Sequence, residues 1–320
     1  MSGTLRRAFP VLVGVALISL SVFTLRREFH AVSLRDLTAD VRRTPPGQLA
    51  LAVSFVALNY LCLAGYELLA IRAIGRRLPA WKVAITASLA YAVSNNVGFS
   101  VVSGTSVRYR FYSRWGLSAD ELPRIVLFNW STFWLGFLVL AGLSVANTPL
   151  PDWVPIHGGA RVVAGWCLVA ASPAYVVAAA WNLPPLRLGP VAFTLPSASI
   201  AFVQLMISLA EWSCAAAVLY SLLPDVHLPF VTFVGAFVLA ILLGMVSHVP
   251  GGVGVFESLL VLLLKPYLTV ASLLPALVVF RAAYYLLPFF VALAVLIADA
   301  LRTRRSGIDH AMPSAGEPSA

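Results

Sequence analysis

The sequence predicts an all-α integral membrane protein, a polytopic helical bundle that contains two interrupted, re-entrant helix pairs in an inverted repeat. Composition gives the class: 60% of the 320 residues are hydrophobic and 11% are charged, and the mean hydropathy is +0.89, unlike that of ordinary soluble domains. Several apolar segments are long enough to cross a bilayer, which takes about 20 residues. Two further apolar segments are interrupted by glycine, proline or asparagine and occupy corresponding places in two halves of the chain.

One membrane domain is expected over residues 1–305, followed by a disordered cytoplasmic tail over 306–320, because no stretch of soluble composition is long enough for a second domain. An uncleaved first span is predicted at 8–25 and an interfacial helix at 33–43. The complete spans that follow are predicted at 49–71, 122–146, 161–181, 197–222 and 271–299.

The later interruption reads S-H-V-P-G-G-V-G-V-F-E from Ser247 to Glu257. The apolar segments on either side of it, 231–246 and 255–264, are each too short to cross a bilayer. Backbone that leaves a helix inside the membrane must be buried in protein or face water. The sequence therefore predicts a broken helix beside a polar cavity, with its irregular backbone at Pro250, Gly251, Gly252 and Gly254.

A second interruption is predicted between the segments 83–98 and 99–115, with irregular backbone at Gly98 and Gly104. The halves 49–146 and 197–299 each contain a span, a broken pair and a span, but they begin on opposite sides of the membrane. Broken helices at matching positions of two opposed halves are typical of transporters whose binding site lies near the bilayer midplane.

Basic residues orient the bundle. Arg72, Arg76, Arg77 and Lys82 form a cluster after one span, and Arg302, Arg304 and Arg305 follow the last. Because cytoplasmic loops are enriched in Lys and Arg, we expect both clusters to face the cytoplasm. The same rule accounts for the net charge of +9, so we do not expect nucleic-acid binding.

Five ionisable residues lie within predicted spans or beside the breaks. Such residues are costly in lipid, so they line cavities or pair with one another. Arginine suits the phosphate of a lipid headgroup, and a carboxylate suits a cationic group. We expect these residues to form a lipid headgroup path, with Glu257 near Arg281; the alternative is structural ion pairing between helices. They are Glu67, Arg108, Glu211, Glu257 and Arg281.

Other chemistry is poorly supported by the sequence. His248 has no second ligand at metal-binding spacing, and Cys62, Cys167 and Cys214 are distant in sequence and lie in apolar segments, so we expect no metal or other cofactor. Nucleotide loops, nucleophile elbows and zinc-protease motifs are missing from the sequence, and we expect no enzyme activity. An intramembrane enzyme that uses Glu257 and His248 as acid and base is a minor alternative.

Several motifs together resemble a known family. They are Y-A-V-S-N-N-V-G-F-S from Tyr91, S-G-T-S-V-R-Y-R-F-Y from Ser103, W-G-L-S from Trp115, the segment from Ser247 to Glu257, and R-A-A-Y-Y-L-L-P from Arg281. The sequence resembles the N-terminal membrane domain of the bacterial lysylphosphatidylglycerol synthase/flippase family. That domain is associated with translocation of aminoacylated phosphatidylglycerol, and the resemblance implies flipping roles for the five ionisable residues.

The resemblance implies a multi-pass protein of the bacterial inner membrane that moves a phospholipid, either aminoacylated phosphatidylglycerol or another modified anionic lipid. Full-length family members continue into an aminoacyltransferase domain, which these 320 residues do not contain, so synthesis is not expected. The expected partners are membrane lipids and a separate lipid-modifying synthase. The alternative function is a non-transporting membrane subunit that supports such a synthase.

Overall fold

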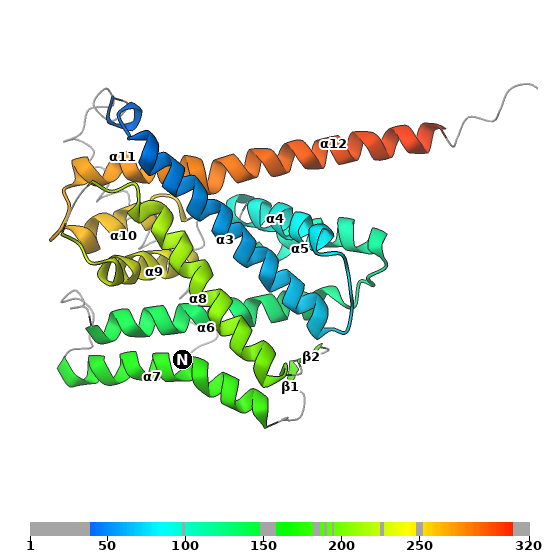
Figure 1. Ribbon diagram of the computed structural model, residues 1–320, viewed down its shortest axis with the longest axis horizontal. Coiled ribbons are helices and arrows are strands. Elements are labelled where there is room, and N and C mark those ends of the chain that lie inside the picture. The colour runs from blue at the N-terminus through cyan, green and yellow to red at the C-terminus, as the bar shows by residue number, and fades with distance from the viewer. Residues whose placement is uncertain are drawn as a thin grey trace, which may run out of the picture.

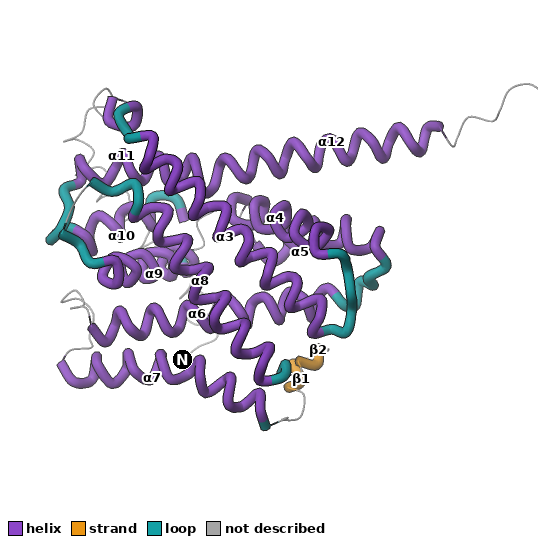
Figure 2. Tube along the Cα trace, in the orientation of Figure 1, coloured by secondary structure: helices purple, strands orange, loops and turns teal. Residues whose placement is uncertain are grey.

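The computed structural model describes residues 39–97, 100–147, 158–181, 186–188, 191–193, 195–224, 227–247 and 252–309. The predicted first span at 8–25 and most of the predicted interfacial helix at 33–43 lie outside these residues. The described part is a helical bundle (Figures 1 and 2). Its elements are α3 (Pro46–Ala73), α4 (Ala80–Val97), α5 (Ser100–Tyr112), η1 (Ser113–Trp115), α6 (Leu122–Asn147), α7 (Gly158–Ala180), β1 (Leu186–Leu188), β2 (Val191–Phe193), α8 (Ala198–Tyr220), α9 (Phe230–Val246), α10 (Val255–Leu264), α11 (Val270–Phe280), η3 (Arg281–Leu286) and α12 (Leu287–Asp309).

Five helical stretches in the described residues are long and apolar enough to cross a membrane. They are α3, α6, α7, α8 and the continuous stretch Val270–Arg302, which runs through α11, η3 and α12. Large apolar side chains point outward from them, and the exposed fraction reaches 66% at Leu61 and 59% at Phe290. Outward apolar surface of this kind suits hydrocarbon as the surrounding solvent. The protein is a multi-pass membrane protein, as the sequence predicts.

The two predicted interruptions are real breaks between short helices. α4 and α5 contain 18 and 13 residues, and α9 and α10 contain 17 and 10, so all four are shorter than the roughly 20 residues of a full span. The start of α4 and the end of α5 lie close together: the ammonium of Lys82 is 5.2 Å from the ring centroid of Trp115, which follows α5. This pair is a helical hairpin.

α9 and α10 pack against each other as a second hairpin, in which the rings of Phe237 and Phe256 meet edge to face with centroids 5.6 Å apart. The two hairpins begin at opposite ends of the bundle. Gln48 at the start of α3 donates to the carbonyl of Leu223, just before α9, over 3.3 Å. The α4–α5 hairpin instead follows the other end of α3. This placement is what an inverted repeat requires, and the repeat itself stays a prediction.

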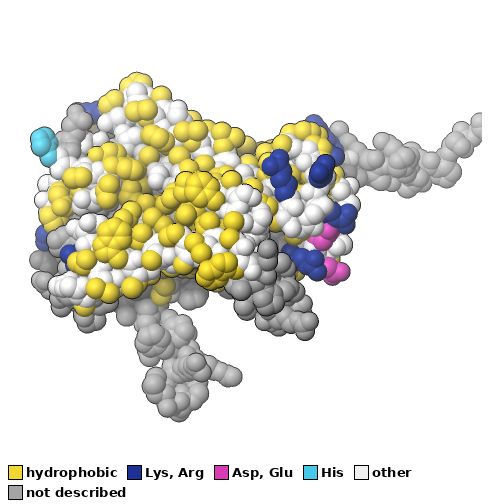
Figure 3. Space-filling view, turned by 60° about the horizontal axis from the view of Figure 1, so that its bottom comes forward, with side chains coloured by type: hydrophobic (Ala, Val, Ile, Leu, Met, Phe, Trp, Pro, Cys, Tyr) yellow, Lys and Arg dark blue, Asp and Glu magenta, His cyan; other side chains and the backbone are white. Residues whose placement is uncertain are grey.

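Arginines and lysines gather where the α4–α5 hairpin begins and ends. Asp299 of α12 accepts hydrogen bonds from Arg110 at 2.7 and 2.9 Å and from Arg114 at 2.8 Å. Arg76 pairs with Glu121 at the same end. Figure 3 shows most of the blue and magenta side chains gathered at the right-hand end of a broad hydrophobic surface. The ends of α3, α5 and α12 therefore form one charged end of the bundle.

Small residues allow helices to pack closely. A Cβ atom added at Gly165 of α7 would lie 2.6 Å from the backbone nitrogen of Ala146 in α6, and one added at Gly142 would lie 2.6 Å from the carbonyl oxygen of Gly165. Helices in membranes associate through such small-residue contacts because lipid supplies no hydrophobic driving force between them. α6 and α7 lie side by side as a result (Figure 1).

Three details differ from the sequence-based predictions. Gly104 lies inside α5 rather than at the break, where a Cβ atom would come within 2.9 Å of Arg108 Nη1. The connector after α7 contains a short antiparallel pairing of β1 with β2. α12 continues to Asp309, four residues into the predicted disordered tail.

Candidate functional site

Glu67 and Arg108 form a buried ion pair between α3 and α5. Arg108 Nε lies 2.8 Å from Glu67 Oε1, and Nη2 lies 3.0 Å from Oε2. The exposed fraction of the side chain is 0% for Glu67 and 7% for Arg108. Tyr112 and Asn129 also donate to the carboxylate, over 3.0 and 2.6 Å. Four donor atoms, two of them on Arg108, hold this charge in place.

Arg108 is also enclosed on its flat face. Its guanidinium carbon lies 4.9 Å from the ring centroid of Tyr91 in α4. A planar cation over an aromatic ring is attracted by the ring quadrupole, most strongly where water is excluded. The first hairpin thus delivers one oriented arginine into the bundle.

The expected proximity of Glu257 and Arg281 is confirmed. Arg281 Nε donates to Glu257 Oε1 over 2.6 Å, and Glu257 Oε2 accepts the N–H of Gly254 over 2.7 Å. Arg281 also lies over the rings of Phe256 and Tyr285, at 5.3 and 4.6 Å. The exposed side-chain fractions are 17% for Arg281 and 14% for Glu257, so solvent or a ligand reaches this pair more easily than the first.

The broken backbone before α10 is partly described. Gly252 and Gly254 have φ angles of +61° and +83°, which L side chains rarely adopt and glycine adopts freely. The chain can therefore turn sharply into α10, whose first turn carries Glu257. The predicted backbone positions Gly98, Pro250 and Gly251 and the candidate His248 lie outside the described residues.

Glu211 lies in the middle of α8, and its side chain has no ion-pair partner among the described residues. Glu211 as a whole is 6% exposed. Asn59 of α3 donates to its carbonyl and to Oε1 over 2.9 and 3.0 Å, and the hydroxyl of Tyr66 donates to Oε2 over 3.4 Å. The predicted third carboxylate therefore has neutral partners only.

The hydrogen bonds around Glu211 involve residues that lie close to both ion pairs along the chain. Tyr66 precedes Glu67 in α3. On the other side, the hydroxyl of Tyr284 in η3 donates to Asn59 Oδ1 over 3.2 Å, three residues after Arg281 in the chain. η3 is a π-helical segment, and such segments are frequent at functional sites. The structure thus brings the five predicted residues together as two ion pairs with Glu211 between them.

Sequence reasoning missed five neutral members of this site. Asn59 and Asn129 are polar residues within apolar spans, and the cost of a polar group in lipid is the signal that identifies them. Tyr66, Tyr112 and Tyr284 give no such signal, because tyrosine is common in membrane helices. Their roles follow from the hydrogen bonds that their hydroxyl groups make.

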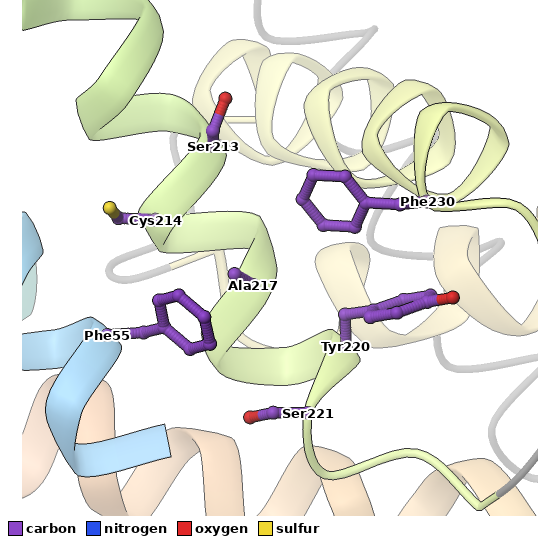
Figure 4. Close-up of a pocket in the computed structure, with 7 residues that line it drawn as sticks. All are labelled: Phe55, Ser213, Cys214, Ala217, Tyr220, Ser221 and Phe230. Carbon is purple, nitrogen blue, oxygen red and sulfur yellow. The ribbon is translucent and has the colours of Figure 1, made fainter. Parts of the chain in front are cut away.

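An apolar pocket lies beside this network, between α3, α8 and the start of α9 (Figure 4). Phe55, Ala217, Phe230 and Tyr220 supply most of its wall, with Ser213, Cys214 and Ser221 completing it. None of the five predicted ionisable residues lines it. Its chemistry suits hydrocarbon rather than a charged headgroup.

Comparison with known proteins identifies the family. The family model described as the lysylphosphatidylglycerol synthase TM region matches residues 11–292. The chain belongs to this family. The match spans every described element except the end of α12, and it confirms the resemblance that the motifs indicated.

Relatives fall into two groups by length. The protein slr0712 of Synechocystis is 30% identical over 287 residues, which is 89% of each chain. The inner membrane protein YbhN of Escherichia coli is 30% identical over 248 residues, 76% of this chain and 77% of YbhN. The phosphatidylglycerol lysyltransferase of Staphylococcus epidermidis is 26% identical over 308 residues, which cover 94% of this chain but 35% of that enzyme.

Proposed function

We propose that this member of the lysylphosphatidylglycerol synthase TM region family moves a phospholipid between the leaflets of the bacterial inner membrane. One observation carries the proposal: two short-helix hairpins, which begin at opposite ends of the bundle, each place a charged side chain in an ion pair beside a shared polar network. Half-helices that meet near the midplane are typical of transporter binding sites. We place the hairpins within the bilayer as re-entrant pairs.

The charged groups suit both parts of a phospholipid headgroup. Arg108 and Arg281 offer planar forks to phosphate oxygens, and the carboxylates of Glu67, Glu211 and Glu257 offer partners to a cationic group. In each ion pair, an arriving headgroup would replace an existing partner of like charge. A headgroup that carries both a phosphate and a cationic group would keep every charge compensated while the lipid passes. The substrate class is a phospholipid, with aminoacylated phosphatidylglycerol or another modified anionic lipid as candidates.

The apolar pocket supports the same function. A lipid whose headgroup enters the bundle must still place its acyl chains in apolar surroundings, because exposure of hydrocarbon to a polar path is unfavourable. The pocket of Phe55, Ala217 and Phe230 lies on α8, the helix that carries Glu211. We propose that it receives part of an acyl chain.

A non-transporting role is the second candidate. The chain spans 35% of the phosphatidylglycerol lysyltransferase of Staphylococcus epidermidis, so in that enzyme a related region is joined to other protein. Here the corresponding function would be that of a membrane subunit that holds lipid for a separate synthase. We prefer transport because the site contains two separate ion pairs and a third buried carboxylate, Glu211, rather than one isolated pair.

Reconstitution separates the candidates. Purified protein in liposomes should exchange a headgroup-labelled phospholipid between leaflets, faster than protein-free liposomes do. Loss of exchange in Glu257→Gln with retention in Gly159→Ala, an open surface position on α7, would tie the activity to the site. Absence of exchange in wild-type protein, with lipid binding intact, would instead favour the subunit role. A chemically changed lipid would indicate an enzyme and contradict both.

A further inference from the structure

Glu211 differs from the other two carboxylates of the site because no arginine compensates it. Glu67 and Glu257 each lie within 3 Å of an arginine nitrogen. Glu211 has hydrogen bonds from Asn59 and Tyr66 instead. Both donors are uncharged.

No cation forms an ion pair with Glu211 among the described residues. The elements around it do carry arginines: Arg72 of α3 and Arg124 of α6 are exposed, Arg161 of α7 donates to the carbonyl of Val145, and Arg281 of η3 pairs with Glu257.

α3 contributes Asn59, Cys62 and Tyr66 to the surroundings of Glu211, and the neighbouring residue on α8 is Cys214. Tyr284 and Tyr285 of η3 and Tyr91 of α4 complete the ionisable groups that act on it electrostatically. The ionisable groups among them are thiols and phenols, which carry no positive charge in either protonation state. α9 and α11 contain no Asp, Glu, Lys, Arg or His.

Two of the cysteines, which are distant in sequence, lie near Glu211. Cys62 and Cys214 are neighbours across α3 and α8, and both are free. Neither supplies positive charge to Glu211. An ionised carboxylate here would be a buried charge without compensation, which proteins avoid by binding a proton.

We propose that Glu211 carries a proton in the resting protein and exchanges it during each transport cycle, so that lipid movement is coupled to the proton gradient. In the coupled step, the O–H bond of the Glu211 carboxyl breaks and the proton passes to water on one side of the membrane. The resulting carboxylate is compensated by positive charge that enters with the substrate or its counter-ion. When that charge leaves, Glu211 takes a proton from water on the opposite side.

The hydrogen bonds of Glu211 lead toward both hairpins. Asn59 connects it to Tyr284 and so to the helix that carries Arg281 of the second site. Tyr66 connects it to the neighbourhood of Glu67 and the first hairpin. Because the hairpins begin at opposite ends of the bundle, opening one of them at a time would expose Glu211 to one side at a time.

This inference rests on the proposed transport function, so its test has one arm that needs no transport. Infrared spectra of purified protein should contain the carbonyl stretch of a protonated carboxylic acid, and Glu211→Gln should remove it. Glu257→Gln should leave that band in place, because Glu257 is paired with arginine. Asn59→Leu removes the hydrogen-bond donor to Glu211 Oε1 and should therefore shift the carbonyl band. That shift assigns the band to Glu211 even if Glu211→Gln does not fold. A spectrum in which Glu211→Gln removes no such band overturns the proposal, whatever the transport result.

The second arm measures coupling. In wild-type proteoliposomes, an imposed pH gradient should change the rate of lipid movement in one direction, relative to the rate in the other, by up to about tenfold per pH unit. Residual exchange by Glu211→Gln should not respond to the gradient, whereas residual exchange by Glu257→Gln should. Wild-type exchange that proceeds equally with and without a gradient overturns the inference but leaves lipid transport standing. No wild-type exchange under any gradient, with the infrared band present, contradicts the transport function and with it the coupling.

Discussion

Arg108 of α5 and Glu67 of α3 face each other through two nitrogen–oxygen contacts of 2.8 and 3.0 Å in a region that excludes solvent. The pair attaches the α4–α5 hairpin to a full span, and Asn129 extends the attachment to α6. A helix of 13 residues is too short to cross a bilayer, so its apolar surface alone does not fix its depth and such a contact can anchor it. The charge pair therefore holds the hairpin while serving as a candidate headgroup site.

Breaking this pair should destabilise the protein. Glu67→Gln leaves Arg108 buried without its counter-charge, and loss of one partner of a buried pair typically costs about 3 to 5 kcal/mol. We expect a lower thermal midpoint in detergent and reduced yield. The double variant Glu67→Gln with Arg108→Met should recover much of the loss, because no charge is then left unpaired. A double variant less stable than either single variant would contradict this account.

Removing the charge of Glu257 should instead spare the fold. The pair with Arg281 is partly exposed, so water can solvate the arginine left behind, and glutamine keeps an oxygen for the Gly254 N–H. We expect near-normal yield and a monodisperse detergent peak for Glu257→Gln. Lipid exchange in liposomes should fall at least about tenfold, equivalent to ~1.4 kcal/mol on the barrier. Exchange by Glu257→Gln at the wild-type rate would remove Glu257 from the proposed site. Aggregation of Glu257→Gln under conditions in which the wild-type protein stays monodisperse would do the same.

Packing of α6 on α7 should tolerate no side chain at the crossing. In Gly165→Ala the new methyl group would meet the Ala146 backbone at 2.6 Å, and overpacking of this kind typically costs about 1 to 3 kcal/mol. Gly159→Ala, where nothing lies within 4 Å, is the matched control on the same helix. Thermal unfolding in mild detergent should separate the two variants. Equal midpoints would mean that the helices separate or shift to accept the methyl group.

Much of the fold could be predicted from sequence because span length is a physical requirement of the bilayer. The apolar segments at 231–246 and 255–264 are too short to cross, and the structure has α9 and α10 there within one residue. The pairing of Glu257 with Arg281 was predictable for a similar reason, since charges within spans seek partners. Composition and charge spacing carry both inferences without any three-dimensional information.

The rest depends on geometry that a linear pattern does not contain. Gly104 reads as a helix breaker, but it provides space beside Arg108 inside α5. Asn59 contacts Glu211 across 152 positions of sequence, a distance over which no local spacing rule applies. The β1–β2 pairing was missed because its prolines and glycines indicate only a connector.

The charged end of the bundle should face the cytoplasm. In a variant without Cys62, Cys167 and Cys214, a cysteine placed at Arg77 or Ser306 should resist membrane-impermeant reagents applied to intact cells. A cysteine at Ala271, which is exposed near the opposite end beside Gln48, should be labelled under the same conditions. Labelling at position 77 or 306 from outside the cell would overturn the topology and the inverted repeat with it.

Acid should weaken the loop between α5 and α6 through Glu121. Hydrogen bonds from Arg76, and from the backbone N–H of Ser118 over 2.8 Å, hold the pKa of the Glu121 carboxyl below its usual value. A carboxyl whose folded pKa is lowered stabilises the protein above the unfolded value of about 4.3, and the contribution is lost as the pH falls through the folded pKa.

Glu121→Gln should therefore lower the thermal midpoint at pH ~7 and make little difference at a pH below the lowered folded pKa, where the wild-type carboxyl is protonated as well. Asp120→Asn is the neighbouring control, because Asp120 is exposed and has no ion-pair partner among the described residues. It should change the midpoint little at either pH. A deficit of Glu121→Gln that stays constant from neutral to acid pH would mean that the glutamine disturbs the loop itself, and the contribution of the Arg76–Glu121 charge pair would then be ruled out.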